Sequence, residues 1–546
     1  MSDARRAAFE RLMNSAPNAT TAPPLVLFED ADLLVVRKPA GWNTHAPAPH
    51  AGEGVFDWLR HREPRWASLA ILHRLDKETS GVMVFGKTPL ANKSLTEQFT
   101  AREVHKRYVF VTDRPVADES FVVESALVRA GEKYLSRQLH AGGERAETRF
   151  RVVKREPGRT LVEAEPVTGR THQIRVHAAE RGLPILGDTL YGGSPAARLC
   201  LHAESISFRH PESRQEITFR AKASFEGDSR LALRESFIAG ETDACRLIHG
   251  ASDGWPGWQV ERLGEFLLSQ SESPLDQSQR AWLEQFPGVR GVYHKWLDRQ
   301  IRRTALAEAS PQLLFGAAAP ERFSIVENGV RYELSFNEGY SVGLFLDQRD
   351  NRRRFFVNHV AANFPLLATG LRRAEVLNTF AYTCGFSVCA ASAGARVTSL
   401  DLSRKYLDWG RRNFELNGID PTGHDFIFGD TFEWLRRLAK KGRLFDVIVL
   451  DPPTFSQSKE RGVFRAEKDY GELVTSALAV LKPGGTLLAS TNAATLAPEK
   501  FLADIDDSVR QARRRILQQH YVPQPPDFPI SREQPAYLKT VWLRIA

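Results

Sequence analysis

The pattern of hydrophobic and polar positions changes once along the chain, near Glu321. Before it, from Val26 to about Ser224, short β-branched runs such as Leu33–Val36 alternate with turns rich in Gly, Pro and Asp. This pattern predicts an α+β domain with a mainly antiparallel sheet. After Glu321, strand-like and helix-like runs alternate, which predicts an α/β Rossmann-like domain with a doubly wound parallel sheet.

Shorter segments complete the predicted organisation. The first 25 residues are expected to form a short helical or frayed arm that ends in a proline-rich turn. Residues 226–242 are expected to be a charged connector. Between Cys245 and Pro320, strand-like runs surround a helix over Gln277–Gln285, which predicts a small α+β domain. The expected domains are therefore 1–25, 26–228, 243–320 and 321–546.

Four predicted strands of the last domain end in polar residues. The carboxyl ends of parallel strands form one edge, where such sheets bind ligands. Asp401 ends the second strand, where an acid can hydrogen-bond the ribose of a nucleotide-like cofactor. Acids at strand ends also cap the next helix, and this alternative stays open for three of them. They are Asp401, Asp430 and Asp451.

Composition and charge fit a multidomain intracellular enzyme. The chain has 546 residues, of which 42% are hydrophobic and 26% charged, as in ordinary globular proteins. Its net charge of +8 favours a polyanionic partner such as RNA. None of the four cysteines forms a close pair, so we expect free thiols in the reducing cytoplasm. No stretch is long and apolar enough for a membrane span, and none is expected.

The candidate chemistry of the first half lies in three motifs. They are HRLDKETSG at 73–81, KRY at 106–108 and TGRTHQIRVH at 168–177. In this order they closely resemble the large-subunit ribosomal (Rlu-type) pseudouridine synthases, over roughly residues 26–225. The resemblance implies conversion of uridine to pseudouridine in RNA, without a redox cofactor or a metal. Taken singly, the two histidines of these motifs are more often structural than catalytic: His73 and His172.

The resemblance also implies roles for single residues. Asp76 would be the carboxylate that acts near C1′ of the ribose, with Arg175 beside it, because a neighbouring cation favours the charged form. Tyr108 would stack on the uracil, which must leave its helical stack to react. Arg74 stays open between a base-displacing side chain and a structural ion pair.

Two motifs of the second half carry a different resemblance. They are VGLFLDQRD at 342–350 and DPPTFSQSK at 451–459. With the strand–helix pattern, they resemble class I S-adenosylmethionine methyltransferases, and among these the 23S ribosomal RNA methyltransferases of the RlmI and RlmK type. The similarity spans roughly residues 240–546, and the second motif looks more like the guanine-N7 branch.

This resemblance implies S-adenosyl-L-methionine as the cofactor. The implied cofactor-binding residues are Asp347, Gln348, Arg349, Asn378, Phe380, Gly385, Asp401 and Asp430. The implied catalytic residues are Asp451, Pro452, Pro453 and Phe455. The rigid prolines would fix backbone carbonyls, and the phenylalanine would stack on a flipped base. The first three cofactor residues could also form an ordinary surface turn. The glycine loop departs from G-x-G-x-x-G, and a Rossmann oxidoreductase could share the strand–helix pattern.

The positions of the cysteines narrow the choice of the methylated atom. Methylating C5 of a pyrimidine requires a cysteine nucleophile, whereas a ring nitrogen attacks the methyl sulfonium directly. No cysteine follows Cys389, and Ser490–Asn492 stands about where the cytosine-C5 branch would place one. Methylation of a nitrogen is therefore preferred.

The sequence thus predicts a bifunctional enzyme that modifies RNA, either 23S ribosomal RNA or a ribosomal precursor. Two alternatives remain open: a single-activity methyltransferase whose first half only binds RNA, and the same two activities on transfer RNA. No metal and no membrane partner are expected.

Overall fold

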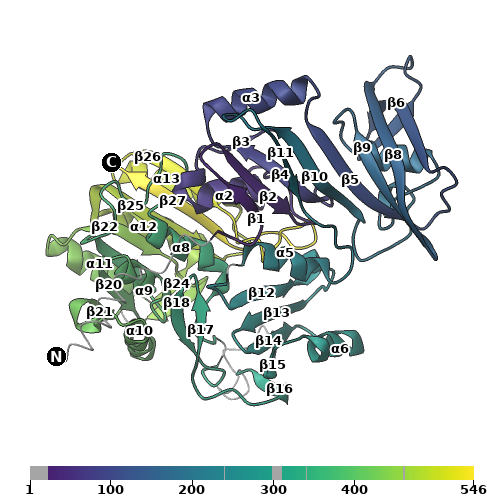
Figure 1. The fold of residues 1–546 in the computed structure, drawn as a ribbon. Helices are drawn as coiled ribbons and strands as arrows, with labels where there is room; N and C mark the ends of the chain where they lie inside the picture. The colour runs from purple at the N-terminus through teal and green to yellow at the C-terminus, as the bar shows by residue number, and fades with distance from the viewer. Residues whose placement is uncertain (1–21, 239, 298–309, 340, 459–461) are drawn as a thin grey trace, which may run out of the picture.

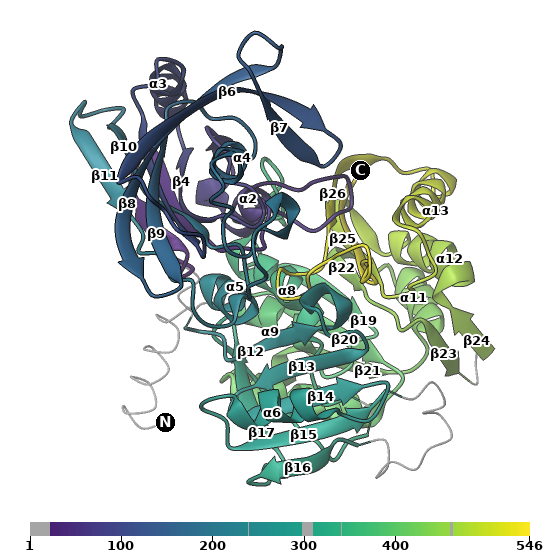
Figure 2. The ribbon, with the colours of Figure 1, turned by 90° about the vertical axis from the view of Figure 1, so that its right-hand side faces the viewer.

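The computed structural model describes residues 22–238, 240–297, 310–339, 341–458 and 462–546. Within them, three large sheets follow one another along the chain and pack into one molecule (Figures 1 and 2). The predicted N-terminal arm lies almost wholly outside the described residues. The multidomain architecture, α+β first and Rossmann-like α/β last, is confirmed.

The first sheet is built from eleven short strands. They are β1 (Val26–Glu29), β2 (Leu33–Lys38), β3 (Ala70–Ile71), β4 (Ser80–Gly86), β5 (His105–Thr112), β6 (Ser120–Ala130), β7 (Lys133–Arg137), β8 (Glu144–Glu156), β9 (Arg159–Pro166), β10 (Leu201–Arg209) and β11 (Glu216–Arg220). The main order is β1-β2-β4-β10-β5-β9-β8-β6-β7. Neighbouring strands pair antiparallel, except β4 with β10. The predicted mainly antiparallel sheet is therefore confirmed.

Three helices accompany this sheet: α2 (Val55–Arg62), α3 (Pro89–Thr100) and α4 (Gln173–Glu180). Short 3-10 turns also occur, η1 (Pro64–Trp66) and η2 (Thr189–Tyr191). Helix α3 begins where Thr88 Oγ1 accepts a hydrogen bond from Ala91 N, with a proline at the first helical position. Three tryptophans are buried in one cluster: Trp42, Trp58 of α2 and Trp66 of η1.

The segment expected to be a charged connector contains a helix with one buried face, α5 (Ser229–Phe237). Arg234 is only 2% exposed and pairs with Asp253 at 2.7 Å. Phe237 packs edge-to-face against Trp42 of the first domain, with ring centroids 5.7 Å apart. The segment links β11 to β12, and its assignment as a connector between domains stays a prediction. The local pattern does not reveal that the charge of Arg234 is paired with a distant residue.

The small middle sheet has five strands in chain order: β12 (Ala244–His249), β13 (Trp258–Leu263), β14 (Phe266–Ser271), β15 (Gly291–Trp296) and β16 (Gln312–Gly316). Helix α6 (Gln277–Gln285) has the predicted bounds and begins with a capping box between Asp276 and Gln279. It links β14 to β15, which pair in parallel and therefore need a crossover. The turn η3 (Gly250–Asp253) follows β12.

The last sheet has seven strands. They are β19 (Glu375–Thr379), β20 (Arg396–Asp401), β21 (Asp425–Phe428), β22 (Phe445–Leu450), β25 (Leu481–Thr491), β26 (Ile516–Val522) and β27 (Lys539–Ile545). The order is β21-β20-β19-β22-β25-β27-β26, and the pairs are parallel except those of β27. All four predicted strand ends are observed. The chain order reverses between β19 and β22, the place where such sheets bind ligands.

Helices and two hairpins surround this sheet. The helices are α8 (Arg349–Val357), α9 (Gly385–Ser392), α10 (Arg404–Leu416), α11 (Thr431–Lys440), α12 (Ala466–Leu478) and α13 (Pro498–Gln511), with 3-10 turns η5 (Leu346–Gln348) and η6 (Pro421–Gly423). The hairpins are β17 (Phe323–Glu327) with β18 (Val330–Leu334), and β23 (Phe455–Ser458) with β24 (Gly462–Arg465).

Helices α2 and α8 hold the first domain against the last (Figure 2). Arg353 of α8 forms an ion pair with Glu63, and both side chains are buried. His359 donates a hydrogen bond from Nε2 to the carbonyl of Arg60, at 2.8 Å. Because these contacts are buried and specific, they fix the orientation of the two domains.

Candidate active sites

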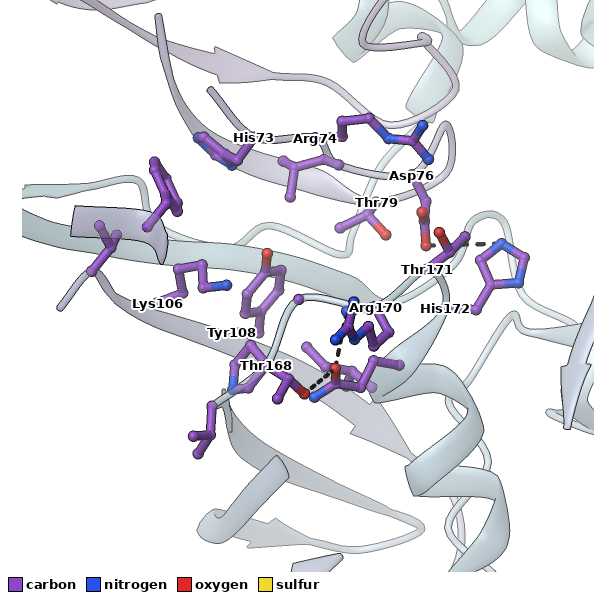
Figure 3. A pocket seen from close by; sticks show the side chains of 18 of the residues that line it. His73, Arg74, Asp76, Thr79, Lys106, Tyr108, Thr168, Arg170, Thr171 and His172 are labelled. Atoms are coloured by element: carbon purple, nitrogen blue, oxygen red, sulfur yellow. Dashed lines mark hydrogen bonds and ion pairs between the residues drawn. The ribbon is translucent and has the colours of Figure 1, made fainter. Parts of the chain in front are cut away.

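The three motifs of the first half converge on one cavity of about 750 Å³ (Figure 3). Asp76 lies on the loop before β4, Tyr108 lies on β5, and Arg175 lies on α4. All three line the cavity. The structure therefore brings together the residues predicted from the first resemblance.

The loop that carries Asp76 is held by buried hydrogen bonds. Thr44 Oγ1 donates to the carbonyl of Leu75 at 2.8 Å and accepts from Leu75 N at 3.2 Å. Lys38 Nζ donates to three carbonyls, including that of Lys77 at 2.9 Å. Burial lowers the pKa of Lys38 to about 7. Lys38 was not singled out in the sequence, although a lysine at the end of an apolar strand was a signal for a buried structural amine.

Arg175 has a fixed partner of its own. Its Nε and one terminal nitrogen each donate a 2.7 Å hydrogen bond to Asp188, and both side chains are buried. The charge of Arg175 still interacts with Asp76 across the cavity. Asp188 was not singled out in the sequence, and its burial in this pair explains why an acid stands there.

One aromatic and one basic side chain, Tyr108 and Lys106, form a wall of the cavity that suits the binding of a base. Burial and the charge of Asp76 raise the pKa of Tyr108, so its hydroxyl stays protonated. Lys106 is also largely buried, and its pKa is lowered for that reason. Arg74 lines the same cavity, is exposed, and forms no ion pair with any residue that the structure describes.

His73 has the structural role that a single histidine usually has. Its Nε2 accepts a hydrogen bond from Val84 N at 3.1 Å, and its ring stacks on Phe99. Burial lowers its pKa to about 3, so the imidazole is neutral. His172 differs, because its Nε2 lies 3.9 Å from Oδ2 of Asp76 (Figure 3).

In the last domain, the carboxylate at the end of β20 faces the loop after β19. Asp401 accepts hydrogen bonds from Tyr382 N and Ser403 N, each at 2.8 Å. Its pKa is raised by burial. A carboxylate oxygen can accept two hydrogen bonds, and each oxygen of Asp401 accepts one of these, so each has capacity left to accept one from a ribose hydroxyl.

The loop after β19 lacks most glycines of the G-x-G-x-x-G motif, and three of its other residues have a strained backbone. Phe380, Tyr382 and Cys384 have φ values of 53°, 48° and 64°, in the left-handed region that non-glycine residues rarely adopt. Such strain concentrates at ligand sites. Gly385 starts α9, where a Cβ atom would lie 3.1 Å from Leu344 Cδ1. Asn378 is buried and donates a hydrogen bond to Ser387 Oγ rather than pointing to solvent.

Two predicted segments far apart in sequence meet at the ends of β22 and β25. Gln348 donates hydrogen bonds from Nε2 to Asp451 Oδ1 at 3.2 Å and to Ser490 Oγ at 2.8 Å. Asp347 accepts one from the hydroxyl of Tyr537 at 2.7 Å. Burial and the charge of Asp347 raise the pKa of Asp451 to about 6. Tyr537 was missed in the sequence because nothing local marks it.

The prolines and the phenylalanine of the motif follow β22 directly. Pro452 is buried and Pro453 is exposed. Phe455 opens the hairpin β23–β24, partly exposed, with the guanidinium of Arg465 6.0 Å from its ring centroid. The motif therefore joins a buried strand end to an exposed hairpin.

Two predicted cofactor residues have other partners. Arg349 forms a buried bidentate pair with Asp527, at 2.6 and 2.8 Å. Asp430 caps α11 through Phe432 N and Glu433 N, and also accepts a hydrogen bond from Ser458. The capping alternative thus holds for Asp430, and contacts of Arg349 and Asp430 with the cofactor stay predictions.

A larger cleft of about 1090 Å³ separates this site from the small middle domain. Asp347, Phe345 and Tyr537 form its wall on one side, and strand residues of the middle sheet form the other. Phe345 and Trp296 are each about half exposed at this cleft. Exposed aromatic side chains of this kind can stack on unstacked bases.

One group of possible metal ligands lies at the domain interface. Glu53, His61 and His520 bring three candidate ligand atoms within 4.8 Å of one another. Burial lowers the pKa of His520, and the nearby guanidinium of Arg354 opposes the binding of a cation. The expectation that the protein holds no metal stays a prediction.

Comparison with known proteins assigns both halves. The family model of RNA pseudouridylate synthase matches residues 32–180, and that of S-adenosylmethionine-dependent methyltransferase matches residues 284–544. Ribosomal RNA large subunit methyltransferase I of Klebsiella pneumoniae is 34% identical over 56% of this chain and 74% of its own length. The chain belongs to this methyltransferase family. Ribosomal RNA large subunit methyltransferase I of Aeromonas salmonicida is 31% identical over 70% of this chain and 92% of its own length.

Solved structures of both kinds are also similar to this chain. A methyltransferase complexed with SAH is 28% identical, with a TM-score of 0.48, and covers 56% of this chain and 76% of its own. Human RNA pseudouridylate synthase domain containing 4 is 24% identical, with a TM-score of 0.31, and covers 42% of this chain and 96% of its own.

The chain therefore joins a pseudouridine synthase domain to an S-adenosylmethionine-dependent methyltransferase domain, and the predicted cofactor is confirmed. Both are enzyme domains, so a first half that only binds RNA is not supported. In the described residues, no helix is long and apolar enough to cross a membrane.

Proposed function

We propose that this enzyme modifies 23S ribosomal RNA twice, converting a uridine to pseudouridine and methylating a guanine at N7. The observation that carries the first activity is Asp76 in a cavity wide enough for a flipped nucleotide, with Tyr108 in its wall. The names of the relatives, large-subunit ribosomal RNA methyltransferases, support the RNA target.

In the first site, the uracil must leave C1′ of its ribose, turn, and rejoin through C5. Asp76 acts on the sugar as a carboxylate, and the charge of Arg175 interacts with it across the cavity. Tyr108 stacks on the extruded uracil, which replaces part of the stacking lost from the helix. Arg74, exposed at the rim and without an ion pair among the described residues, fits the base-displacing role better than a structural one.

In the second site, the residues fit the cofactor through Asp401 and the strained loop at Phe380–Cys384. S-adenosylmethionine, when bound, supplies the methyl group. Asp347 lies close enough to Asp451 for its charge to raise the pKa of Asp451. Attack by N7 leaves a positive charge on the guanine ring, and two nearby carboxylates stabilise that charge. An acid-rich site therefore suits guanine N7.

The cysteines of this domain do not suit pyrimidine C5. Cys384 and Cys389 are buried, and burial raises the pKa of each thiol to about 12. A nucleophilic cysteine must ionise to a thiolate, which these environments oppose. Ser490 contacts Gln348 at the place where a cysteine would be needed.

The chemical test uses the full-length enzyme and 23S ribosomal RNA transcripts. N7-methylguanosine makes its strand cleavable by borohydride and aniline, so reaction products should show one new, cofactor-dependent cleavage. RNA that carries 5-fluorocytidine should form no stable adduct. Recovery of 5-methylcytidine, or a covalent adduct, would contradict the guanine-N7 assignment. Modification of transfer RNA in preference to ribosomal RNA would instead contradict the proposed target.

A further inference from the structure

The backbone of His172 is strained in a way that points its side chain at Asp76. It precedes α4 with φ 57° and ψ 14°, in the left-handed region. For a residue other than glycine this conformation costs on the order of 1 kcal/mol, and it persists only where the surroundings impose it. Its side chain is 17% exposed and lines the cavity, directed toward the Asp76 carboxylate (Figure 3).

A chain of polar contacts runs behind this imidazole. Tyr134 N donates a hydrogen bond to the hydroxyl oxygen of Tyr191 at 2.9 Å. That hydroxyl lies 2.8 Å from Nδ1 of His172. On the far side of the ring, Nε2 lies 3.9 Å from Oδ2 of Asp76. The contacts connect strand β7, turn η2 and the start of α4 to the proposed catalytic carboxylate.

The proton positions follow from what each atom can donate. Tyr191 oxygen already accepts from a backbone N–H, and its own hydrogen has one acceptor among the described residues, Nδ1 of His172. Nδ1 is then unprotonated, and the proton of the neutral ring is on Nε2, facing Asp76. Burial lowers the pKa of His172, and this effect outweighs the opposing charge of Asp76, so the ring stays neutral.

Tyr191 is itself held in place. The guanidinium of Arg175 lies 5.0 Å from the centroid of its ring, and Arg175 is fixed by its bidentate pair with Asp188. The ring of Tyr134 meets His172 edge-on, with centroids 5.6 Å apart. The orientation of the imidazole is thus determined from both sides.

We propose that His172 is a positioning residue for Asp76, with Tyr191 selecting the tautomer that presents Nε2–H to the carboxylate. The inference rests on the proposed catalytic role of Asp76. The 3.9 Å separation shortens to a hydrogen bond when RNA fills the cavity, as catalytic contacts commonly do. His172 then holds one carboxylate oxygen and leaves the other to act on the ribose.

The test compares pseudouridine formation by full-length variants. His172→Gly removes the imidazole and relieves the backbone strain, because glycine adopts positive φ freely. We expect kcat to fall about 10- to 100-fold, the worth of a hydrogen bond to a charged group, while KM for RNA changes little. Free imidazole in the buffer should restore part of the rate. His140→Gly, at an exposed position of the same domain, should keep the wild-type kcat.

Tyr191→Phe retains the ring and its packing and removes only the hydroxyl. We expect it to lower kcat less than His172→Gly does, and the double variant to be no slower than His172→Gly alone, because the hydroxyl acts through the imidazole. Losses that multiply in the double variant, unchanged kcat in His172→Gly, or no effect of imidazole would overturn the inference. Asp76→Asn separates the two claims: full activity in that variant would remove the proposed role of Asp76 itself.

Discussion

Trp58 of the pseudouridine synthase domain donates a hydrogen bond from Nε1 to Oδ2 of Asp350, 3.1 Å away in the methyltransferase domain. Asp350 stands two residues after Gln348, which contacts Asp451 in the proposed methyl-transfer site. The next residue, Asn351, donates to Oε1 of Gln348 at 2.7 Å. One helix, α8, therefore faces the first domain on one side and supports the second active site on the other.

The buried pair at this interface should contribute strongly to stability. Glu63→Gln leaves the buried guanidinium of Arg353 without its carboxylate. We expect a loss of about 3 to 5 kcal/mol in the free energy of unfolding, as for other broken buried pairs. Urea denaturation followed by tryptophan fluorescence measures it. Glu119→Gln, which breaks the exposed pair with Arg155, is the matched control and should cost less than about 1 kcal/mol.

Asp76→Asn should abolish pseudouridine formation and leave methylation intact, because the substitution keeps the size of the side chain and removes its charge. Tritium release from RNA with 5-tritiated uridine measures the first activity, and methyl incorporation measures the second. Asp118→Asn, at an exposed site paired with Arg181, is the control. Release close to the wild-type rate in Asp76→Asn would reject the assignment.

Asp401→Ala should weaken cofactor binding. A charge-assisted hydrogen bond to a ribose hydroxyl is worth about 1.5 to 3 kcal/mol, so Kd should rise about 10- to 150-fold. Calorimetry should use the full chain, because α8 is docked on the first domain. Asp408→Ala on the exposed face of α10 should bind normally. An unchanged Kd, or equal binding of a nicotinamide dinucleotide, would contradict the assignment.

The methylation rate should depend on pH through Asp451. Its pKa is raised from the usual 3.8 to about 6, so the carboxylate becomes fully charged only above that pH. If the charge on Asp451 stabilises the positive charge that develops on the guanine in the transition state, kcat/KM rises about tenfold per pH unit below 6 and levels off above it. The same shift makes the native state lose stability as pH rises from 3.8 to about 6, because Asp451 ionises in the unfolded chain while it stays protonated in the native state. A rate independent of pH in this window would contradict the role.

The strand ends of the last domain could be predicted because buried parallel strands have continuous apolar sequences. In β22 (Phe445–Leu450) five of the six positions are buried. Helix α6 was equally predictable from its capping residues. That Asp347 and Asp451 lie close together could be expected only from the family resemblance, since the two are about a hundred residues apart in the sequence.

What the sequence could not supply is the choice of partner for each charge. Arg349 stands in a motif that suggests cofactor contact, yet both ends of its guanidinium bind Asp527, far along the chain. Arg234 stands in a segment expected only to be a charged connector, and it is buried against Asp253. Long-range ion pairs leave no periodic signal, so only the fold reveals them. The cytoplasmic location inferred from the free cysteines stays a prediction, although all four thiols are free and buried.

The central claim is that one chain carries two independent RNA-modifying sites. It is tested most directly by mapping pseudouridine and 7-methylguanosine in 23S ribosomal RNA from cells that express the wild-type chain, Asp76→Asn or Asp451→Asn. The account predicts that Asp76→Asn removes one pseudouridine only, and that Asp451→Asn removes or strongly reduces one 7-methylguanosine only. Unchanged modification of 23S ribosomal RNA in both variants would contradict it.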